Sequence, residues 1–293
     1  PDRIGLTKPV SVGIVGDAKK VAQGILAQLS ATAGDNGREE RKAAIAKKKA
    51  DWAAELATLV HEDDDPGTTW NERARDREPQ KMSPRQMWTA IKASTPENAI
   101  LSSDIGNNCA IGNAFPTFEE GRKYLAPGLF GPCGYVFPAI CGAKVAQPDV
   151  PVIGMAGVGA FGISMNEMVS CGRDSWPAVT MLVCRNYQWG AEKRNTTLWY
   201  SDNFVGTELD QNVSYAAIAE ACGVKGVQAA SADELSSLLK EAVRAQMEDG
   251  VTTFIEILVN QELGEPFRRD AMKAPVQVAG INKDDMRPQP DVK

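Results

Sequence analysis

Short apolar runs alternate with longer segments of helical periodicity along most of this chain, and this alternation constrains the fold more than any other feature. Strands are predicted for four apolar runs: 99–104, 150–157, 178–186 and 252–259. Helices are predicted from Ser83 and over 163–173, 187–195 and 232–247. Strands that alternate with helices form a parallel sheet with helices on both faces, and ligands bind at the carboxyl ends of its strands. We therefore predict an α/β fold with its site in the loops after those strands.

The segment before this alternation has a different character. A buried strand is predicted over 10–15, an amphipathic helix over 18–30 and a long helix over 38–59. Charged residues without helical periodicity then fill 62–79, which predicts a domain boundary. We assign residues 1–75 to the end of a Rossmann-like central domain plus a linker, and 76–293 to the main domain. A chain that enters a strand this soon after Pro1 has the pattern of one cut within a domain.

Composition narrows the classes of function. The net charge is −6 over 293 residues, and Lys and Arg are scattered, so we expect neither nucleic acid nor membrane as a partner. No apolar run approaches the roughly 20 residues of a membrane span, and no targeting segment is seen, so we expect a cytoplasmic protein. Six cysteines without a CxxC pair are predicted to be reduced, mostly buried thiols. The single histidine, His61, lies in an acidic stretch and is expected to be solvated.

Three loops after predicted strands could carry chemistry: 104–108, 157–162 and 185–190. The second is rich in glycine and precedes a helix, which suits a phosphate group but is also common as a simple packing turn. The third supplies Asn186 beside main-chain oxygens, which suits Mg²⁺, although an asparagine there more often caps a helix. Taken alone, these loops leave both alternatives open.

Longer strings carry a family resemblance. The segment AGVGAFGISMNEMVSCGRDSWPAVTMLVCRN is similar to the cofactor-binding domain of the thiamine-diphosphate-dependent enzymes. Within that group the chain resembles the sulfoacetaldehyde acetyltransferases, through FGPCGYVFPAICGAKVAQP, RNYQWGAEKRN, DNFVGTELDQNVSYAAIAEACG and GEPFRRDAMKAPVQVAGI. The resemblance covers nearly the whole chain. It implies a thiamine-diphosphate-binding fold that holds the cofactor's diphosphate and Mg²⁺.

The resemblance also implies roles for individual residues. Cys133 would lie under the cofactor and support its bent shape, and Asn186 with the main-chain oxygen of Gln188 would bind Mg²⁺. The diphosphate would be held by a set of small and amide residues: Asn107, Asn108, Gly157, Gly159 and Ala160. One position departs from the pattern, because Val158 occupies the place of the family's metal-binding Asp. An altered sequence, a degenerate homologue and a metal site completed by water would each account for it.

The implied reaction converts sulfoacetaldehyde and phosphate into acetyl phosphate and sulfite, a step of taurine and sulfonate breakdown. The cations Lys193, Arg194 and Arg268 are candidates for binding the sulfonate or phosphate, although salt pairing suits each of them better. The family's activating Glu lies on a pyrimidine-binding domain that precedes the part seen here. Because that domain comes from a neighbouring subunit, the resemblance implies at least a homodimer and an isolated chain that is inactive. A non-catalytic homologue and an acetolactate synthase-like lyase are the alternatives.

Overall fold

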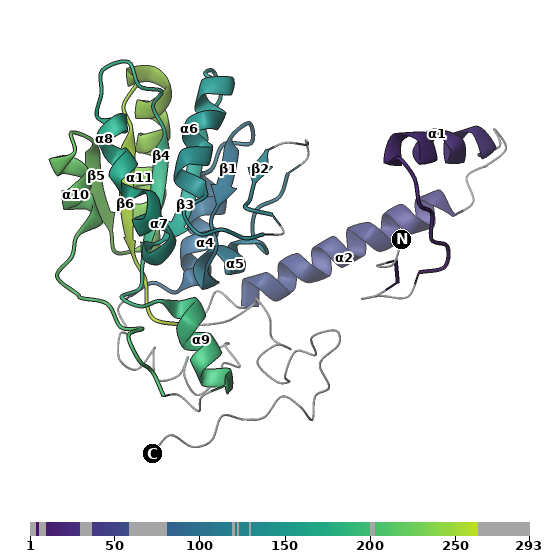
Figure 1. Cartoon of the computed structure of the whole chain (residues 1–293), viewed down its shortest axis with the longest axis horizontal. Helices are drawn as coiled ribbons and strands as arrows, with labels where there is room; N and C mark the ends of the chain where they lie inside the picture. Colours follow the sequence, from purple (N-terminus) through teal and green to yellow (C-terminus); the bar gives the residue numbers. More distant parts are fainter. Residues whose placement is uncertain are drawn as a thin grey trace. The chain divides into compact units, whose positions relative to one another are not determined.

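A computed structural model describes residues 4–5, 10–29, 37–58, 81–118, 121, 123–128, 130–199 and 203–262 (Figure 1). The described residues separate into two compact units, one before Leu56 and one from Leu56 onward. Each unit is considered by itself. None of the helices in these ranges is long and apolar enough to cross a membrane. The predicted boundary over 62–79 and His61 lie outside the described residues.

The second unit is built on a six-stranded, fully parallel sheet with the order β2-β1-β3-β4-β6-β5. The four predicted strands are confirmed: β1 (Ile100–Ser103), β3 (Val152–Gly157), β4 (Thr180–Arg185) and β6 (Thr253–Leu258). Sequence analysis missed the two edge strands, β2 (Tyr124–Leu125) and β5 (Lys225–Ala229). An edge strand is covered less completely, so β5 has the mixed sequence KGVQA and not an apolar run.

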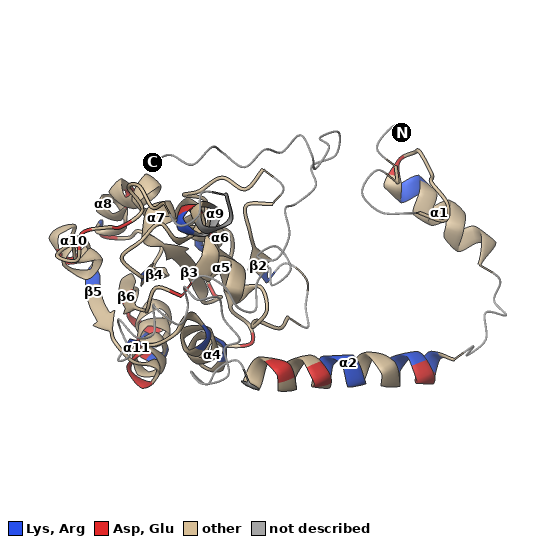
Figure 2. Cartoon of the chain, turned by 90° about the horizontal axis from the view of Figure 1, so that it is seen from below, with Lys and Arg blue, Asp and Glu red and all other residues tan. Residues whose placement is uncertain are grey.

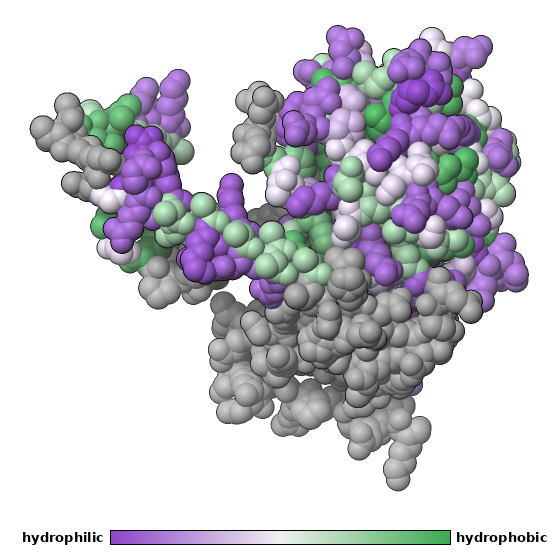
Figure 3. Space-filling model, turned by 180° about the vertical axis from the view of Figure 1, so that it is seen from behind, coloured by the Kyte–Doolittle hydropathy of each residue, from purple (hydrophilic) through white to green (hydrophobic). Residues whose placement is uncertain are grey.

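Helices cover both faces of this sheet, as predicted (Figure 1). Alternate residues of a strand point to opposite faces, so Leu182 of β4 lies in one core and Met181 in the other. The first core is closed by α4 (Pro84–Ser94), α5 (Asn107–Gly112) and α11 (Ala232–Arg244). The second is closed by α6 (Val136–Ala146), α7 (Val158–Ser164), α8 (Met168–Cys171) and α10 (Tyr215–Ala221). Hydrophilic and hydrophobic residues are intermixed on the face seen in Figure 3.

Helix starts differ from the predictions at two sites. The helix predicted over 163–173 begins at Val158, and a 3₁₀ turn over Met165–Glu167 separates α7 from α8. The glycines of 157–162 cost helix stability, but Phe161 compensates by packing between Phe137 and Phe254. The helix predicted over 187–195 begins instead at Gly190 (α9, Gly190–Trp199), because Tyr187 takes a left-handed φ of 56°.

Other helix limits were predicted more closely. Helix α4 starts as predicted after Ser83, which forms a capping box with Gln86. In the loop predicted over 104–108, Asn107 and Asn108 already belong to the first turn of α5. Helix α11 ends at Arg244, and a π-helical turn (η3, Ala245–Asp249) follows it.

The first unit contains α1 (Ala18–Gln28), which is capped by Asp17, and α2 (Arg38–Thr58), which continues into the second unit. Figure 2 shows acidic and basic residues interspersed along α2, where Lys47 pairs with Asp51. Both helices were predicted. The strand predicted over 10–15 is wrong: none of the described residues pairs with it, and Val12 is 76% exposed. A strand is stable only when a neighbour satisfies its backbone, so apolar sequence alone did not suffice.

Candidate functional site

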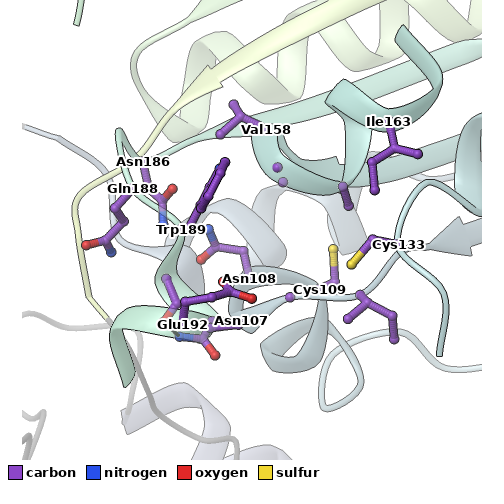
Figure 4. Close-up of a pocket in the computed structure, with 17 residues that line it drawn as sticks. Asn107, Asn108, Cys109, Cys133, Val158, Ile163, Asn186, Gln188, Trp189 and Glu192 are labelled. Atoms are coloured by element: carbon purple, nitrogen blue, oxygen red, sulfur yellow. Dashed lines mark hydrogen bonds between the residues drawn. The ribbon is translucent and has the colours of Figure 1, made fainter. Parts of the chain in front are cut away.

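A cavity of about 300 Å³ lies at the carboxyl ends of β1, β3 and β4 (Figure 4). Every residue that sequence analysis proposed for cofactor or metal binding lines it: Asn107, Asn108, Cys133, Gly157, Val158, Gly159, Ala160, Asn186 and Gln188. The lining also includes residues that were not proposed: Ile105, Gly106, Cys109, Ile163, Trp189, Gly190, Ala191 and Glu192. Segments up to 87 residues apart (105–192) therefore build one pocket, because parallel strands end at the same edge of the sheet.

Gly190 is the point where three amide side chains of the pocket meet. A Cβ added there would lie 3.4 Å from Asn107 Nδ2, 3.5 Å from Asn186 Nδ2 and 3.6 Å from Gln188 Nε2. Asn107 Nδ2 also donates a 2.8 Å hydrogen bond to the carbonyl of Gly190, which ties the start of α5 to the start of α9. The residues predicted after β1 and after β4 are thus in direct contact.

Several amide oxygens in this group have no partner. Asn107 Oδ1, Asn108 Oδ1 and Gln188 Oε1 are buried and accept no hydrogen bond within the described structure. Their amide nitrogens are engaged, because Asn108 Nδ2 donates to Cys184 Sγ at 2.9 Å and Gln188 Nε2 to the carbonyl of Gln261 at 2.9 Å. Unpaired buried acceptors are unfavourable, so this side of the pocket favours a ligand that brings donors or positive charge.

The main-chain oxygen of Gln188 is placed by a short antiparallel bridge to Glu208. The bridge uses the hydrogen bonds Trp189 N–H to Thr207 O and Leu209 N–H to Tyr187 O, both 2.9 Å. In such a pair the central residues point their own N–H and C=O away from the partner strand. The carbonyl of Gln188 is therefore not used by the bridge, as its predicted role as a metal ligand requires.

Asp104 positions the loop that carries Cys133. Its carboxylate accepts hydrogen bonds from the backbone N–H groups of Ile105 (2.8 Å), Gly134 (3.2 Å) and Val136 (2.8 Å). Gly134 has a φ of 82°, and a Cβ there would lie 2.8 Å from Ile163 Cγ2. The loop is thus held between the end of β1 and α7, and Cys133 is directed into the cavity (Figure 4).

Helix α7 forms the opposite side of the pocket. A Cβ at Gly157 would meet no atom within 4 Å. Gly157 is the N-cap of α7 and has no side chain to cap the helix. A Cβ on Gly159 would lie 3.1 Å from Trp189 Cδ1, so the indole packs closely against the backbone there. Val158 is buried, with 4% of its surface exposed, and belongs to the core beneath α7. It brings an apolar group to the place where the resemblance implies a carboxylate.

The lining thiols of Cys109 and Cys133, and the thiol of Cys184 that contacts Asn108, are protonated at neutral pH. Burial raises the pKa of Cys109 to about 12 and raises that of Cys184 as well. Desolvation, with smaller contributions from Asp104 and Glu192, raises the pKa of Cys133. A neutral thiol is a soft, weakly polar group. Cys133 therefore suits contact with an apolar part of a ligand and does not suit attack as a nucleophile.

Thiamine diphosphate and Mg²⁺ fit the lining unequally. Open space beside Gly106 and Gly157 lets backbone approach a diphosphate, and Ile163, Trp189 and Cys133 supply apolar contacts for rings. A divalent cation would find the neutral oxygens of Asn186 and Gln188. The only acidic residue of the lining is Glu192, and no cluster of three His, Cys, Asp or Glu side chains occurs among the described residues. The lining thus fits the cofactor better than Mg²⁺, because Val158 supplies no carboxylate at the position where the resemblance implies one.

Of the cations proposed for anion binding, Lys193 has a described side chain, and it does not line the pocket. Lys193 is fully buried, pairs with Glu208 and lies 5.0 Å from the ring of Phe204. The salt pairing that sequence analysis favoured for Lys193 is therefore present, between a buried ammonium group and the exposed carboxylate of Glu208. The side chain of Arg194 and all of Arg268 lie outside the described part of the chain.

Trp189 and Glu192 are the polar or aromatic lining residues that sequence reasoning missed. Both belong to the string RNYQWGAEKRN, which had been singled out as a whole. The helix predicted over 187–195 placed Trp189 inside the helix. Because α9 begins only at Gly190, Trp189 lies in the loop before it.

Comparison with known proteins identifies a matching family model. Residues 104–257 match "Thiamine pyrophosphate enzyme, C-terminal TPP binding domain". The chain is 68% identical over 289 residues to a sulfoacetaldehyde acetyltransferase of Roseovarius nubinhibens, covering 99% of this chain and 48% of that protein. It is 66% identical to a sulfoacetaldehyde acetyltransferase of Rhodobacter capsulatus, covering 99% of this chain and 49% of that protein. The chain thus spans about half the length of the curated relatives it matches.

A solved structure shares the fold. The thiamine diphosphate-dependent 4-hydroxybenzoylformate decarboxylase of Rhodococcus jostii RHA1 superposes with a TM-score of 0.56 at 24% identity. The match covers 62% of this chain and 33% of the decarboxylase. The likeness supports the arrangement of the sheet and its helices.

Proposed function

Because this chain belongs to the thiamine pyrophosphate enzymes, through their C-terminal TPP binding domain, we propose that it is the cofactor-binding part of a sulfoacetaldehyde acetyltransferase. The reaction is the conversion of sulfoacetaldehyde and phosphate into acetyl phosphate and sulfite. The observation that carries this proposal is the 68% identity to the Roseovarius nubinhibens enzyme over almost the whole chain. The presence of all the implied cofactor residues around one cavity supports it.

The residues of the chain have separable tasks in this proposal. Gly157 and Gly159 let the backbone approach the diphosphate, while Asn107 and Asn108 line the same cavity. The thiol of Cys133 supports the cofactor from the loop that Asp104 fixes. When bound, thiamine diphosphate supplies the carbon nucleophile for the aldehyde.

Two further parts of the proposal concern Mg²⁺ and a neighbouring subunit. Mg²⁺ would use the side chain of Asn186 and the main-chain oxygen of Gln188, without a carboxylate at Val158. The activating Glu would come from a pyrimidine-binding domain of a neighbouring subunit, which makes the working enzyme at least a homodimer. These substrates fit a cytoplasmic enzyme that acts in taurine and sulfonate breakdown.

A chimera tests the activity. The N-terminal half of the Roseovarius nubinhibens enzyme would be joined to this chain, once with Val158 and once with Val158→Asp. We expect sulfite and acetyl phosphate to form from sulfoacetaldehyde and phosphate, at least with the Asp variant. A chimera that folds and binds thiamine diphosphate, yet forms neither product in either version, would refute the acetyltransferase proposal. Acetolactate formed from pyruvate instead would support the lyase alternative.

A second candidate function follows from Val158 alone. A homologue that kept the fold but lost metal affinity would serve as a non-catalytic binding or assembly subunit. The two proposals differ in cofactor binding, because a ligand that binds only the native state raises its melting temperature. No rise in melting temperature with thiamine diphosphate and Mg²⁺, together with a clear rise for Val158→Asp, would favour the non-catalytic homologue.

A further inference from the structure

The indole of Trp189 lies against the backbone of Gly159 at the edge of the cofactor pocket. A Cβ placed on Gly159 would lie 3.1 Å from Trp189 Cδ1 and 3.2 Å from Nε1, but 3.9 Å from Cγ. The edge of the indole that carries the N–H group is therefore the part nearest to Gly159. Figure 4 shows Trp189 among the residues that line the pocket. The proposed function assigns Gly159 to the diphosphate, so this N–H lies beside the expected position of the phosphates.

The backbone of Trp189 is held in place from both sides. Its N–H donates a 2.9 Å hydrogen bond to the carbonyl of Thr207, and its carbonyl accepts a 3.0 Å hydrogen bond from the N–H of Lys193. The next residue, Gly190, accepts the 2.8 Å hydrogen bond from Asn107 Nδ2 that ties α9 to α5. The indole is therefore carried by a backbone whose position is fixed by three hydrogen bonds.

The chemistry of the indole N–H suits an anionic oxygen. An indole nitrogen can donate a hydrogen bond but cannot accept one. The buried Trp88 donates its bond to the carbonyl of Asn108 at 2.6 Å, whereas no residue in the described part of the chain accepts one from the half-exposed Trp189. No Lys or Arg is among the described residues that line the pocket, so neutral donors must meet much of the charge of a diphosphate. Hydrogen bonds to charged acceptors are stronger than those to neutral ones.

We propose that the indole N–H of Trp189 donates a hydrogen bond to a phosphate oxygen of thiamine diphosphate, which makes Trp189 a binding residue for the cofactor. This inference rests on the proposed function, because it takes the diphosphate to lie against Gly159. The side chain would have two parts with separate tasks: the ring packs on Gly159, and the N–H binds the anion. Phe at this position would keep the first task and lose the second, which makes the inference testable.

NMR spectroscopy of the full chain labelled with nitrogen-15 tests the hydrogen bond directly. Each of the six tryptophans gives one indole N–H signal, and the signal that is absent from Trp189→Phe belongs to Trp189. The probes are thiamine diphosphate and inorganic pyrophosphate, each with Mg²⁺, and thiamine without phosphate. We expect both diphosphate ligands to move the Trp189 proton signal downfield, because a charged acceptor deshields the proton, and we expect thiamine to leave it in place.

Isothermal titration calorimetry measures what the hydrogen bond contributes to affinity. For Trp189→Phe we expect the Kd of both diphosphate ligands to rise about 10-fold, the scale of one hydrogen bond to a charged group. The matched control is Trp52→Phe in α2, where the tryptophan is 40% exposed, close to the 46% of Trp189. This control should bind both ligands as wild type does. Circular dichroism would confirm that both variants fold.

The outcomes separate this inference from the proposed function. Binding of both diphosphate ligands with an unmoved Trp189 signal, and with equal affinity in Trp189→Phe, would overturn the inference and leave the proposed function standing. A signal that responds to inorganic phosphate and not to either diphosphate ligand would also overturn it, because the donor would then serve the second substrate. Absence of binding to both wild type and Val158→Asp would overturn the inference together with the proposed cofactor site.

Discussion

A buried isopropyl group stands in the pocket at position 158, where the family resemblance implies an Asp. The neighbouring oxygens, from Asn186 and Gln188, are neutral, and the only lining carboxylate belongs to the exposed Glu192. Hard divalent cations favour anionic oxygens, so one side chain decides how well this pocket can hold Mg²⁺. The fold does not depend on the exchange, since Val158 packs well in its core.

Substitution Val158→Asp is expected to raise Mg²⁺ affinity in the presence of thiamine diphosphate by about 10-fold or more, the scale on which metal sites respond to altered ligation. Isothermal titration calorimetry would measure it. The control is Val158→Asn, which has nearly the same shape without the charge and should gain much less. Equal affinity in wild type and the Asp variant would contradict the prediction.

The buried thiol of Cys109 should make the free energy of unfolding depend on pH. Its folded pKa of about 12 exceeds the ordinary value of 9.0 because burial disfavours the thiolate. The native state therefore holds a proton that the unfolded state loses, so this stability is complete below pH 9 and declines as the pH rises toward 12. Between about pH 8 and about pH 10.5 the contribution should fall by roughly 2 kcal/mol. Urea unfolding of wild type and Cys109→Val at both pH values would measure it, and identical pH dependence would refute it.

At the scale of elements, the pocket depends on how strand ends are joined to the helices after them. Asp104 at the end of β1 binds the N–H groups that open α6, and Asn107 at the start of α5 binds the carbonyl of Gly190 at the start of α9. These contacts link the loops that precede α5, α6 and α9. Removing one should therefore affect stability and site geometry together.

Asp104→Ala is expected to lower the free energy of unfolding by about 3 kcal/mol, because it leaves the part-buried N–H of Gly134 and the buried N–H of Val136 without their charged acceptor. Urea denaturation would measure the change. Asp149→Ala, at an exposed position, is the matched control and should change stability by less than about 0.5 kcal/mol. Similar effects for both variants would show that the hydrogen bonds of Asp104 contribute little.

Replacement of two glycines by Ala should have opposite effects on the stability of the fold. A Cβ at Gly226 of β5 would lie 2.0 Å from the carbonyl oxygen of Ala216 in α10, so Gly226→Ala should destabilise the fold by about 3 kcal/mol. A Cβ at Gly142 of α6 meets nothing within 4 Å, so Gly142→Ala should stabilise by about 1 kcal/mol through helix propensity. Thermal unfolding would compare them. A tolerated Gly226→Ala would mean that α10 can move away from β5.

At the scale of the whole molecule, the chain corresponds to about half of each relative, and the described pocket offers no carboxylate other than Glu192. We therefore expect the isolated chain to form no measurable acetyl phosphate from sulfoacetaldehyde and phosphate. A hydroxamate assay with thiamine diphosphate and Mg²⁺ present would measure it, and the chimera described above serves as the positive control. Product formation by the pure chain would show that the activating group lies within it.

The sequence alone determined the α/β class and the four central strands, because buried parallel strands need continuous apolar runs. The family resemblance, and not the local pattern, named the nine residues proposed for the site, all of which line one pocket. Tertiary structure decided what local pattern cannot encode. Residues 10–15 form no strand because none of the described residues pairs with them. Packing of Phe161 lets α7 start earlier, within the glycine-rich segment. Only the folded chain brings Trp189 onto Gly159 and pairs the buried Lys193 with Glu208. These contacts depend on long-range proximity, which no short window of sequence contains.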